Sequence, residues 1–200
     1  MRLFVALEPE KEVLDALQNL QQEAKEQLPQ HSVSDERKAT AEHIRTAHSP
    51  WRMIDGDKMH LTLQFLGGNI THHKIEEIKP ELQKIEHPSF EIECRGVGAF
   101  AHAQGAKILW AGAKSEGLEG LVQKVRQGMR NIGIEEDNPF SPHITIARCK
   151  FPSNISEFVQ KNQDRLWHDK KWKVDSFSLI ESVHVLGGHE YQELQKYRLL

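Results

Sequence analysis

The stretches "HLTLQFLG" (residues 60–67) and "HITIARC" (residues 143–149) repeat one phrase: histidine, aliphatic residue, threonine, aliphatic residue. Each stretch alternates polar and apolar positions, which is typical of a β-strand with two different faces. Histidine and threonine are poor choices for filling a core twice. The phrase, written HxTx below, therefore predicts two strands that bury their aliphatic residues and present a histidine and a threonine on the other face.

The surroundings of the two strands repeat as well. In each half an apolar strand (2–7 or 106–113) precedes an amphipathic helix (10–28 or 115–131) and then the HxTx strand. Leu3 and His60 are 57 positions apart, Ile108 and His143 are 35 apart, and the difference of 22 is the length of the polar segment 29–50. We interpret the chain as a diverged duplication with repeat units of about 1–95 and 105–200, and with an insertion loop at 29–50.

The rest of the chain adds further elements. Strands are expected at 89–100, 171–181 and 190–200, and helices at 71–85 and 154–163. Thr71 is a suitable N-cap for the first of these helices, and Pro80 is expected to kink or split it. Two similar lobes related by an approximate two-fold axis would bring the HxTx strands together.

Composition narrows the classes of function. The 200 residues carry a net charge of −3, which argues against a surface that holds long nucleic acid by its backbone. No apolar run is long enough to span a bilayer or to act as a signal peptide, so a cytoplasmic protein without a membrane partner is expected. The only two cysteines, Cys94 and Cys149, argue against a disulfide scaffold or a thiolate metal site.

The paired strands suggest a chemistry. On one strand, positions i and i+2 lie roughly 7 Å apart on the same face, so His60 and Thr62 can touch one group, and so can His143 and Thr145. Histidine has an ordinary pKa near 6.5, so one ring can accept a proton while the other donates one. Hydroxyls can bind an anionic oxygen. This set of groups suits displacement at a phosphodiester without a metal ion.

The sequence also resembles a known family, the two-histidine (2H) phosphoesterases, and within it the RNA 2′,3′-cyclic phosphodiesterases once called 2′-5′ RNA ligases. The resemblance covers nearly the whole chain, through "MRLFVALEPE", "MHLTLQFLG", "GVGAF", "ILWAGA" and "FSPHITIARC". It implies a single α+β domain of two interleaved lobes, with two antiparallel sheets around a central groove and helices outside. It also implies a monomer without cofactor or metal.

The resemblance further implies roles for individual residues. His60 would donate a proton, His143 would activate water, and Thr62, Thr145 and Arg148 would bind the phosphate. Strict alternation puts Arg148 on the face opposite His143, so we expect it to reach the site from the end of the strand. The expected reaction opens 2′,3′-cyclic phosphates at RNA 3′ ends, tRNA fragments among them, to 2′-phosphates. Some members of the family also catalyse 2′-5′ ligation.

Two alternatives stay open: a 2H enzyme for small cyclic nucleotides or 2′-5′ oligoadenylates, and a module that binds RNA ends without catalysis. Other residues have competing interpretations. His184 is either a surface histidine or a third groove histidine, and His72 and His73 lack a third ligand for zinc. Four aromatic residues are expected in the core, one of them available to stack on a base: Trp51, Phe65, Phe100 and Trp110. Four lysines form either a solvated face or a surface that steers RNA: Lys161, Lys170, Lys171 and Lys173.

Overall fold

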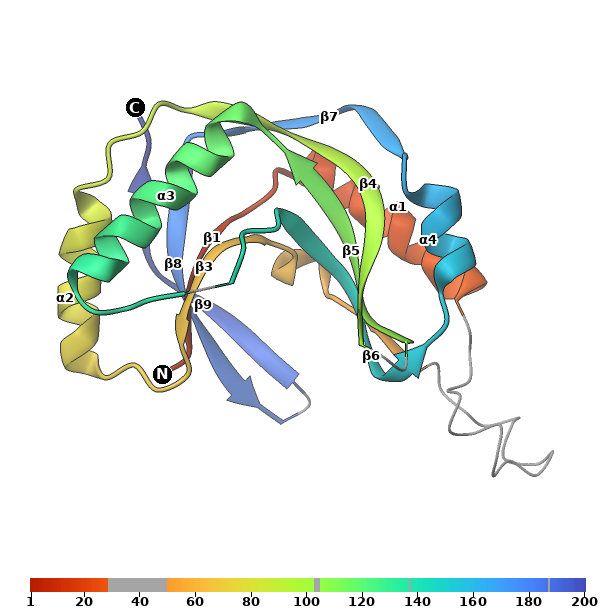
Figure 1. Ribbon diagram of the computed structural model, residues 1–200, viewed down its shortest axis with the longest axis horizontal. Helices are drawn as coiled ribbons and strands as arrows, with labels where there is room; N and C mark the ends of the chain where they lie inside the picture. The colour runs from red at the N-terminus through yellow and green to blue at the C-terminus, as the bar shows by residue number, and fades with distance from the viewer. Residues whose placement is uncertain (29–49, 103–104, 137, 187) are drawn as a thin grey trace.

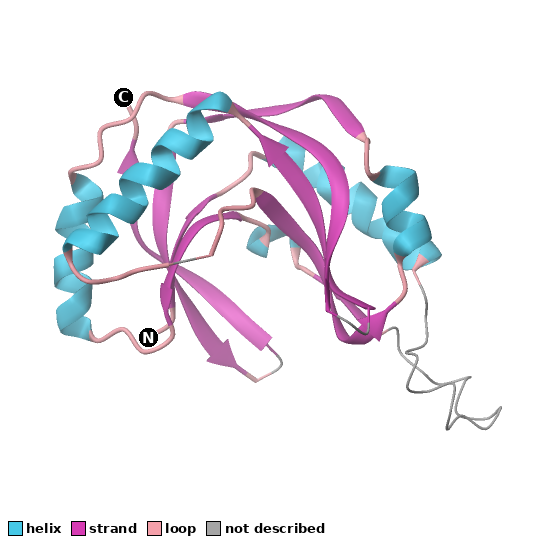
Figure 2. Cartoon of the chain, in the orientation of Figure 1, coloured by secondary structure: helices cyan, strands magenta, loops and turns pink. Residues whose placement is uncertain are grey.

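The computed structural model of the protein describes residues 1–28, 50–102, 105–136, 138–186 and 188–200 (Figure 1). The loop expected at 29–50 lies outside the described residues, except for Pro50. Strands occupy the middle of the molecule and helices lie at its two outer sides (Figure 2).

The strands form two antiparallel groups with matching order. Reading outward from the centre, the first lobe has the order β3, β1, β8, β9, and the second has β6, β5, β4, β7. The first group comprises β1 (Leu3–Leu7), β3 (Leu61–Gly67), β8 (Ser176–Val185) and β9 (Gly188–Arg198). The second comprises β4 (Phe90–His102), β5 (Gly105–Lys114), β6 (His143–Ser153) and β7 (Leu166–Val174), with the short β2 (Trp51–Met53) paired to β6.

The two HxTx strands are the innermost strand of each lobe, and they meet there. One antiparallel pair, Leu61 with Ile144, joins β3 to β6, so the two sheets are continuous through a single contact. The matching strand order confirms the predicted bilobal α+β fold with two antiparallel sheets. Each lobe draws strands from both halves of the sequence, and the division into repeat units 1–95 and 105–200 remains a prediction.

The helices cross between the lobes. α1 (Lys11–Gln27) follows β1 but packs on β6 and β7, whereas α3 (Glu116–Asn131) follows β5 but packs on β3, β4 and α2. α2 (His72–Gln83) lies beside α3 at one outer side, and α4 (Ser156–Asn162) lies near α1 at the other (Figure 1). The short 3-10 turn η2 (Gly56–Lys58) leads into β3. α1 thus covers the lobe opposite its own preceding strand, and α3 contacts strands of both lobes, which ties the lobes together.

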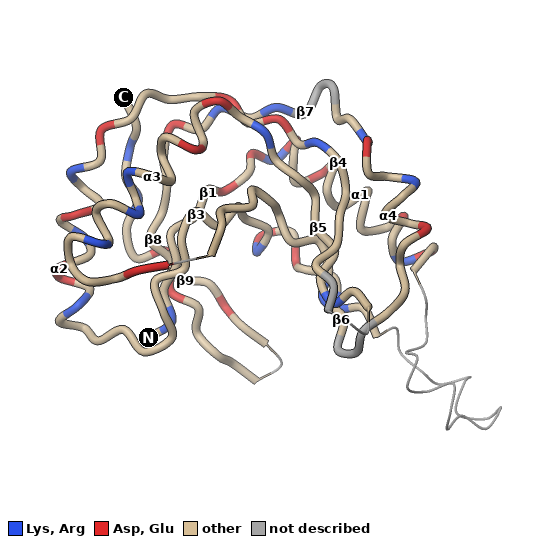
Figure 3. Tube along the Cα trace, viewed as in Figure 1, with Lys and Arg blue, Asp and Glu red and all other residues tan. Residues whose placement is uncertain are grey.

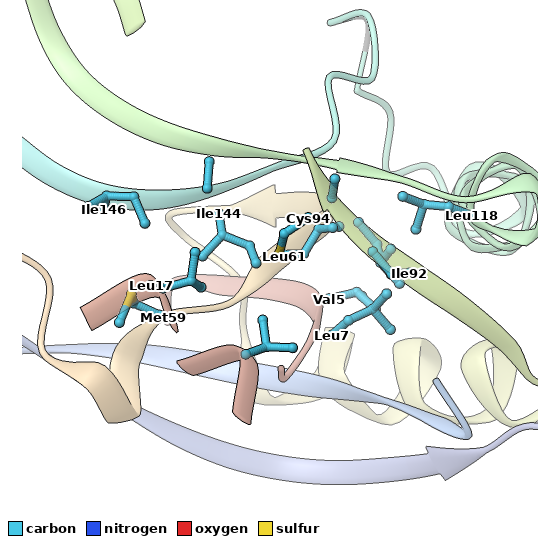
Figure 4. Packing of buried hydrophobic residues seen from close by; sticks show 14 of the residues in the cluster. Val5, Leu7, Leu17, Met59, Leu61, Ile92, Cys94, Leu118, Ile144 and Ile146 are labelled. Carbon is cyan, nitrogen blue, oxygen red and sulfur yellow. The ribbon is translucent and has the colours of Figure 1, made fainter. Parts of the chain in front are cut away.

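A shared hydrophobic core lies behind the junction. Leu61 and Ile144 are fully buried in one cluster with Leu17 of α1 and with Cys94 of β4 (Figure 4). The alternation seen in the sequence explains this placement, since Leu61, Leu63, Ile144 and Ile146 all face the core. The polar residues of both strands are therefore left on the other face.

One local expectation was wrong, and one alternative of a second is excluded. The apolar stretch 171–181 is not one strand, because Asp175 separates β7 of the second lobe from β8 of the first. Of the kink or split expected at Pro80, the split is excluded, because α2 runs through Pro80 to Gln83, and a kink there remains a prediction. Thr71 does cap the start of α2, accepting a hydrogen bond from the Lys74 amide. Within the described residues, no helix combines the length and the apolar character that crossing a membrane requires.

Candidate functional site

The register at the junction arranges the two HxTx pairs crosswise. Leu61 pairs with Ile144 in an antiparallel ladder. Continued by one residue on each side, this register sets His60 opposite Thr145 and Thr62 opposite His143. Since Leu61 and Ile144 are fully buried, the four polar residues share the opposite face. The two histidines therefore lie diagonally across one pseudo-two-fold axis, each facing a threonine of the other lobe.

Each HxTx strand also contains a β-bulge at the same place. On β3, Ala6 pairs with Thr62 and Val5 with Gln64, so Leu63 is an extra residue. Leu63 and Gln64 are both buried although they are neighbours in the sequence. The bulge reverses the alternation, and Phe65 returns to the face of His60 and Thr62, where it lines a cavity.

The equivalent bulge on β6 corrects the expectation for Arg148. Trp110 pairs with Thr145 and Leu109 with Ala147, which leaves Ile146 as the extra residue. Ile146 and Ala147 are both fully buried, and Arg148 then faces the cavity beside His60. Arg148 thus reaches the site by the bulge and not from the strand's end. It occupies the position in the second lobe that Phe65 occupies in the first.

Different groups satisfy the backbone at the two bulges. The Ile146 carbonyl accepts hydrogen bonds from the buried Gln21 side chain at 2.9 Å and from the Ile54 amide at 2.9 Å. In the first lobe the Phe65 amide donates to the Glu136 carboxylate at 3.2 Å. Because buried backbone groups need partners, these contacts hold each bulge in place. Gln21 therefore helps to aim Arg148.

The two imidazole rings are oriented alike. Nδ1 of His60 lies 2.8 Å from the Lys58 carbonyl, and Nδ1 of His143 lies 2.7 Å from the Ser141 carbonyl. A carbonyl only accepts, so Nδ1 carries the proton in each ring. Nε2 is then the free nitrogen on both rings, able to accept a proton when neutral and to donate one when charged. The carbonyl two residues earlier fixes this tautomer in both lobes.

Aromatic residues pack around both histidines, more tightly around His60. Phe4 stacks on His60 with ring centroids 4.7 Å apart, and Tyr191 meets it edge-on at 5.1 Å. Around His143, Phe100 packs edge-on at 4.8 Å and Trp110 lies at 6.3 Å. Both rings are thus shielded from water on their sides.

The second glycine of "GVGAF", Gly98, makes room for the Trp110 ring. These residues lie inside β4, where Gly98 pairs with Trp110, and a Cβ on Gly98 would come within 2.2 Å of the indole. Gly96 adopts a left-handed φ of 74° where β4 changes register against β5. Gly98 therefore serves the close packing of Trp110 beside His143, whereas a Cβ on Gly96 would meet the Gln163 carbonyl.

This packing makes both rings less basic. The pKa of His60 is lowered from its ordinary 6.5 to about 4, chiefly because the ring is buried, and the charges of Arg148 and His143 act in the same direction. Burial also lowers the pKa of His143, again with a contribution from Arg148. Both rings are therefore mostly neutral at pH 7 in the unliganded protein. An anion bound between them would raise both pKa values.

A cavity of about 270 Å³ opens beside His60. Of the residues expected from the sequence, His60, Thr62 and Arg148 line it, whereas His143 and Thr145 are not among its lining residues. They adjoin it across the junction, and the positive charge of His143 lowers the pKa of His60. The structure thus brings all five predicted residues to one face, with the hollow on the side of the first lobe.

The cavity also contains residues that the sequence did not single out as site residues. Arg2 and Phe4 come from the start of the chain, and three more come from the β8–β9 hairpin: Ser182, His189 and Tyr191. One signal was available, because Arg2 and Phe4 share the alternation of β1. In the hairpin the sequence offered only His184 as a candidate, because the partner strand that decides which residues face the cavity could not be read from the sequence.

The remaining candidates lie elsewhere. His184 is exposed and does not line the cavity, although its ring lies 5.0 Å from that of His189. His73 forms an exposed ion pair with Glu77. Lys171 and Lys173 lie on β7, the outermost strand of the second lobe, and the side chain of Lys170 lies outside the described residues. Among the residues described, no three His, Cys, Asp or Glu side chains gather as metal ligands.

Comparison with solved structures supports this fold. A crystal structure of a Thermus thermophilus protein superposes with a TM-score of 0.78 at 25% identity, covering 99% of this chain and 97% of the other. E. coli LigT in its apo form superposes with a TM-score of 0.72 at 22% identity, covering 99% and 96%.

Sequence relatives are similar over most of the chain. A Thermotoga maritima protein described as "RNA 2′,3′-cyclic phosphodiesterase" is 33% identical over 144 residues, which are 70% of this chain and 75% of the relative. A Thermus thermophilus protein with the same description is 30% identical over 163 residues, or 74% and 76%. Residues 33–185, which include both HxTx strands, match the 2′-5′ RNA ligase superfamily. With matching geometry, strand order and sequence, the chain belongs to the 2′-5′ RNA ligase superfamily.

Proposed function

We propose that this protein hydrolyses the 2′,3′-cyclic phosphate at the 3′ end of RNA. The observation that carries the proposal is the crosswise pair of histidines, each with Nε2 free and each opposite a threonine of the other lobe. The description of the relatives as RNA 2′,3′-cyclic phosphodiesterases supports the same substrate class.

The reaction needs two proton transfers on opposite sides of the phosphorus. One neutral histidine takes a proton from water through Nε2 while the water oxygen bonds to phosphorus. The bond from phosphorus to the ribose 3′ oxygen breaks, and the second histidine, protonated, donates a proton to that oxygen. The products are a 2′-phosphate and a 3′-hydroxyl. Thr62, Thr145 and Arg148 bind the non-bridging oxygens, and Arg148 also offsets their charge.

The family resemblance assigns the acid to His60 and the base to His143. In the unliganded protein His60 is the more strongly shifted ring, with a pKa of about 4, so it holds a proton less readily at neutral pH. An anionic phosphate placed between the rings raises both pKa values and can restore the proton to the acid. The assignment of acid and base therefore depends on the bound substrate.

The test is an assay with a short oligoribonucleotide that ends in a 2′,3′-cyclic phosphate. We expect a 2′-phosphate end, turnover that persists in EDTA, and loss of turnover in His60→Ala and in His143→Ala. An intact cyclic end after long incubation would exclude the proposal. A 3′-phosphate product would instead show that the bond from phosphorus to the 2′ oxygen is the one that breaks.

A small cyclic nucleotide is the second candidate substrate, since the cavity of about 270 Å³ lies close to the lower end of the volumes of small-ligand pockets. The ratio of kcat/KM for the oligonucleotide to that for the mononucleotide separates the two. A monomeric state, a cytoplasmic location and tRNA fragments as natural substrates remain predictions.

A further inference from the structure

The cavity beside His60 carries more polar groups than one phosphate requires. His60, Thr62 and Arg148 serve the cyclic phosphate in the proposed function. Three further polar side chains line the same cavity without a role in that reaction: Arg2, Ser182 and His189. They lie beyond β3, toward the outer strands of the first lobe.

These three residues form one group. The Ser182 amide donates to the Arg2 carbonyl at 2.8 Å, and the Ser182 hydroxyl lies 3.2 Å from Nδ1 of His189. β8, which carries Ser182, is two strands away from β3, so at about 4.8 Å per strand the group lies roughly 10 Å from the HxTx strand. The group is therefore distinct from the histidine pair but open to the same cavity.

The charge of this group suits an anion. The Arg2 guanidinium lies 5.0 Å from the centre of the Phe65 ring, and no carboxylate of the described residues is within ion-pairing distance of it. Figure 3 shows basic segments at the N-terminal end of the chain and at β6. Burial lowers the pKa of His189, and four positive groups lower it further: His184, Arg2, Arg148 and Arg52. This corner of the cavity has a positive field and hydrogen-bond donors.

We propose that Arg2, Ser182 and His189 form a second anion subsite, which binds the 5′-phosphate of the terminal nucleotide while the histidine pair holds its 2′,3′-cyclic phosphate. The two phosphates are separated by one ribose, and Tyr191, which is 37% exposed, lines the cavity with both groups. The proposal rests on the proposed function and narrows its substrate. A nucleotide with a 5′-phosphoryl group, as in any RNA chain, fills both subsites, and a nucleoside cyclic phosphate fills one.

The experiment compares kcat/KM for three substrates: adenosine 2′,3′-cyclic phosphate, its 5′-phosphorylated form, and a dinucleotide that ends in a 2′,3′-cyclic phosphate. Both substrates with a 5′-phosphoryl group should exceed the first by about 10- to 100-fold, the range of a charged hydrogen-bonding group. Arg2→Gln and His189→Gln should each reduce this preference. Arg198→Gln is the matched control, since it removes the same charge at the opposite end of β9 and should leave the preference intact.

The outcomes separate the two proposals. Equal kcat/KM for all three substrates, or a loss in Arg2→Gln that is the same for all three, would overturn the second subsite. A preference for the dinucleotide without one for the 5′-phosphorylated mononucleotide would also overturn it, because the added nucleoside would then be what is recognised. Absence of turnover for all three substrates would overturn the proposed function itself.

Discussion

Both lobes contain an HxTx strand, and the two strands differ in the side chain that follows the bulge. Both place a histidine and a threonine on one face, and both reverse the alternation with a bulge three positions after the histidine. After the bulge the first lobe presents Phe65 and the second presents Arg148. The shared part supplies the two histidines that we propose as proton carriers, and the unlike part gives the cavity an apolar side and a cationic side. We infer that this asymmetry orients the substrate between two nearly equivalent histidines.

The largest effect is expected from removing either proton carrier. His60→Ala and His143→Ala should each lower kcat by about 10²–10⁴, because each removes one acid–base step. His184→Ala, an exposed histidine near but outside the cavity, is the control and should stay close to wild type. Turnover measured on the oligonucleotide checks this; full activity in either single variant would rule out paired histidines.

Truncating a buried residue of the β3–β6 junction should destabilise the protein equally from either lobe. Leu61→Ala and Ile144→Ala each empty a fully buried position where β3 meets β6, and each should cost about 2–5 kcal/mol of unfolding free energy. Chemical denaturation measures the loss. A single cooperative transition in both variants would support one shared core, whereas two separate transitions would argue that the lobes fold independently.

Substitutions of Arg148 and of Phe65, which occupy equivalent positions in the two lobes, should affect kcat and KM differently. Arg148→Gln removes a charged donor to the phosphate, worth about 1.5–3 kcal/mol, and should lower kcat/KM by roughly 10- to 100-fold with most of the loss in kcat. Phe65→Leu leaves the charge of Arg148 in place and removes the aromatic ring. It should therefore mainly raise KM, by roughly tenfold if a base stacks on that ring. Identical kinetic patterns in the two variants would contradict distinct roles.

The hydrogen bond from Gln21 to the Ile146 carbonyl should affect turnover only by positioning Arg148. Gln21→Met removes the buried donor to the Ile146 carbonyl and should lower kcat/KM less than Arg148→Gln does. In the double variant the Gln21 change should have no further effect on kcat/KM, because the side chain it positions is gone. An additive loss would show that Gln21 acts by another route.

The smallest effect is a shift in pH dependence. kcat/KM reports the free enzyme, which needs one neutral and one protonated histidine. Since both pKa values are depressed, with that of His60 at about 4, kcat/KM should peak below pH 6.5 and fall as the pH rises further, when the remaining proton is lost. Arg148→Gln removes a charge that lowers both pKa values, so the peak should move to higher pH. A peak above pH 8 in the unaltered protein would contradict the depressed values.

The sequence by itself determined the elements that depend on local pattern. Alternation defined both HxTx strands and put His60, Thr62, His143 and Thr145 on the face away from the core, and spacing predicted a duplication. These features follow from the two-residue period of a strand, which needs no knowledge of its neighbours.

Only the tertiary structure decided what depends on strand pairing. A bulge exists relative to a partner strand, so the direction of Arg148 could not follow from its own position in the sequence. The separation of β7 from β8 at Asp175 was hidden for the same reason, because the two strands join different lobes. The contribution of Ser182 and His189 to the cavity arises from sheet order, which brings the last strands of the chain beside the first.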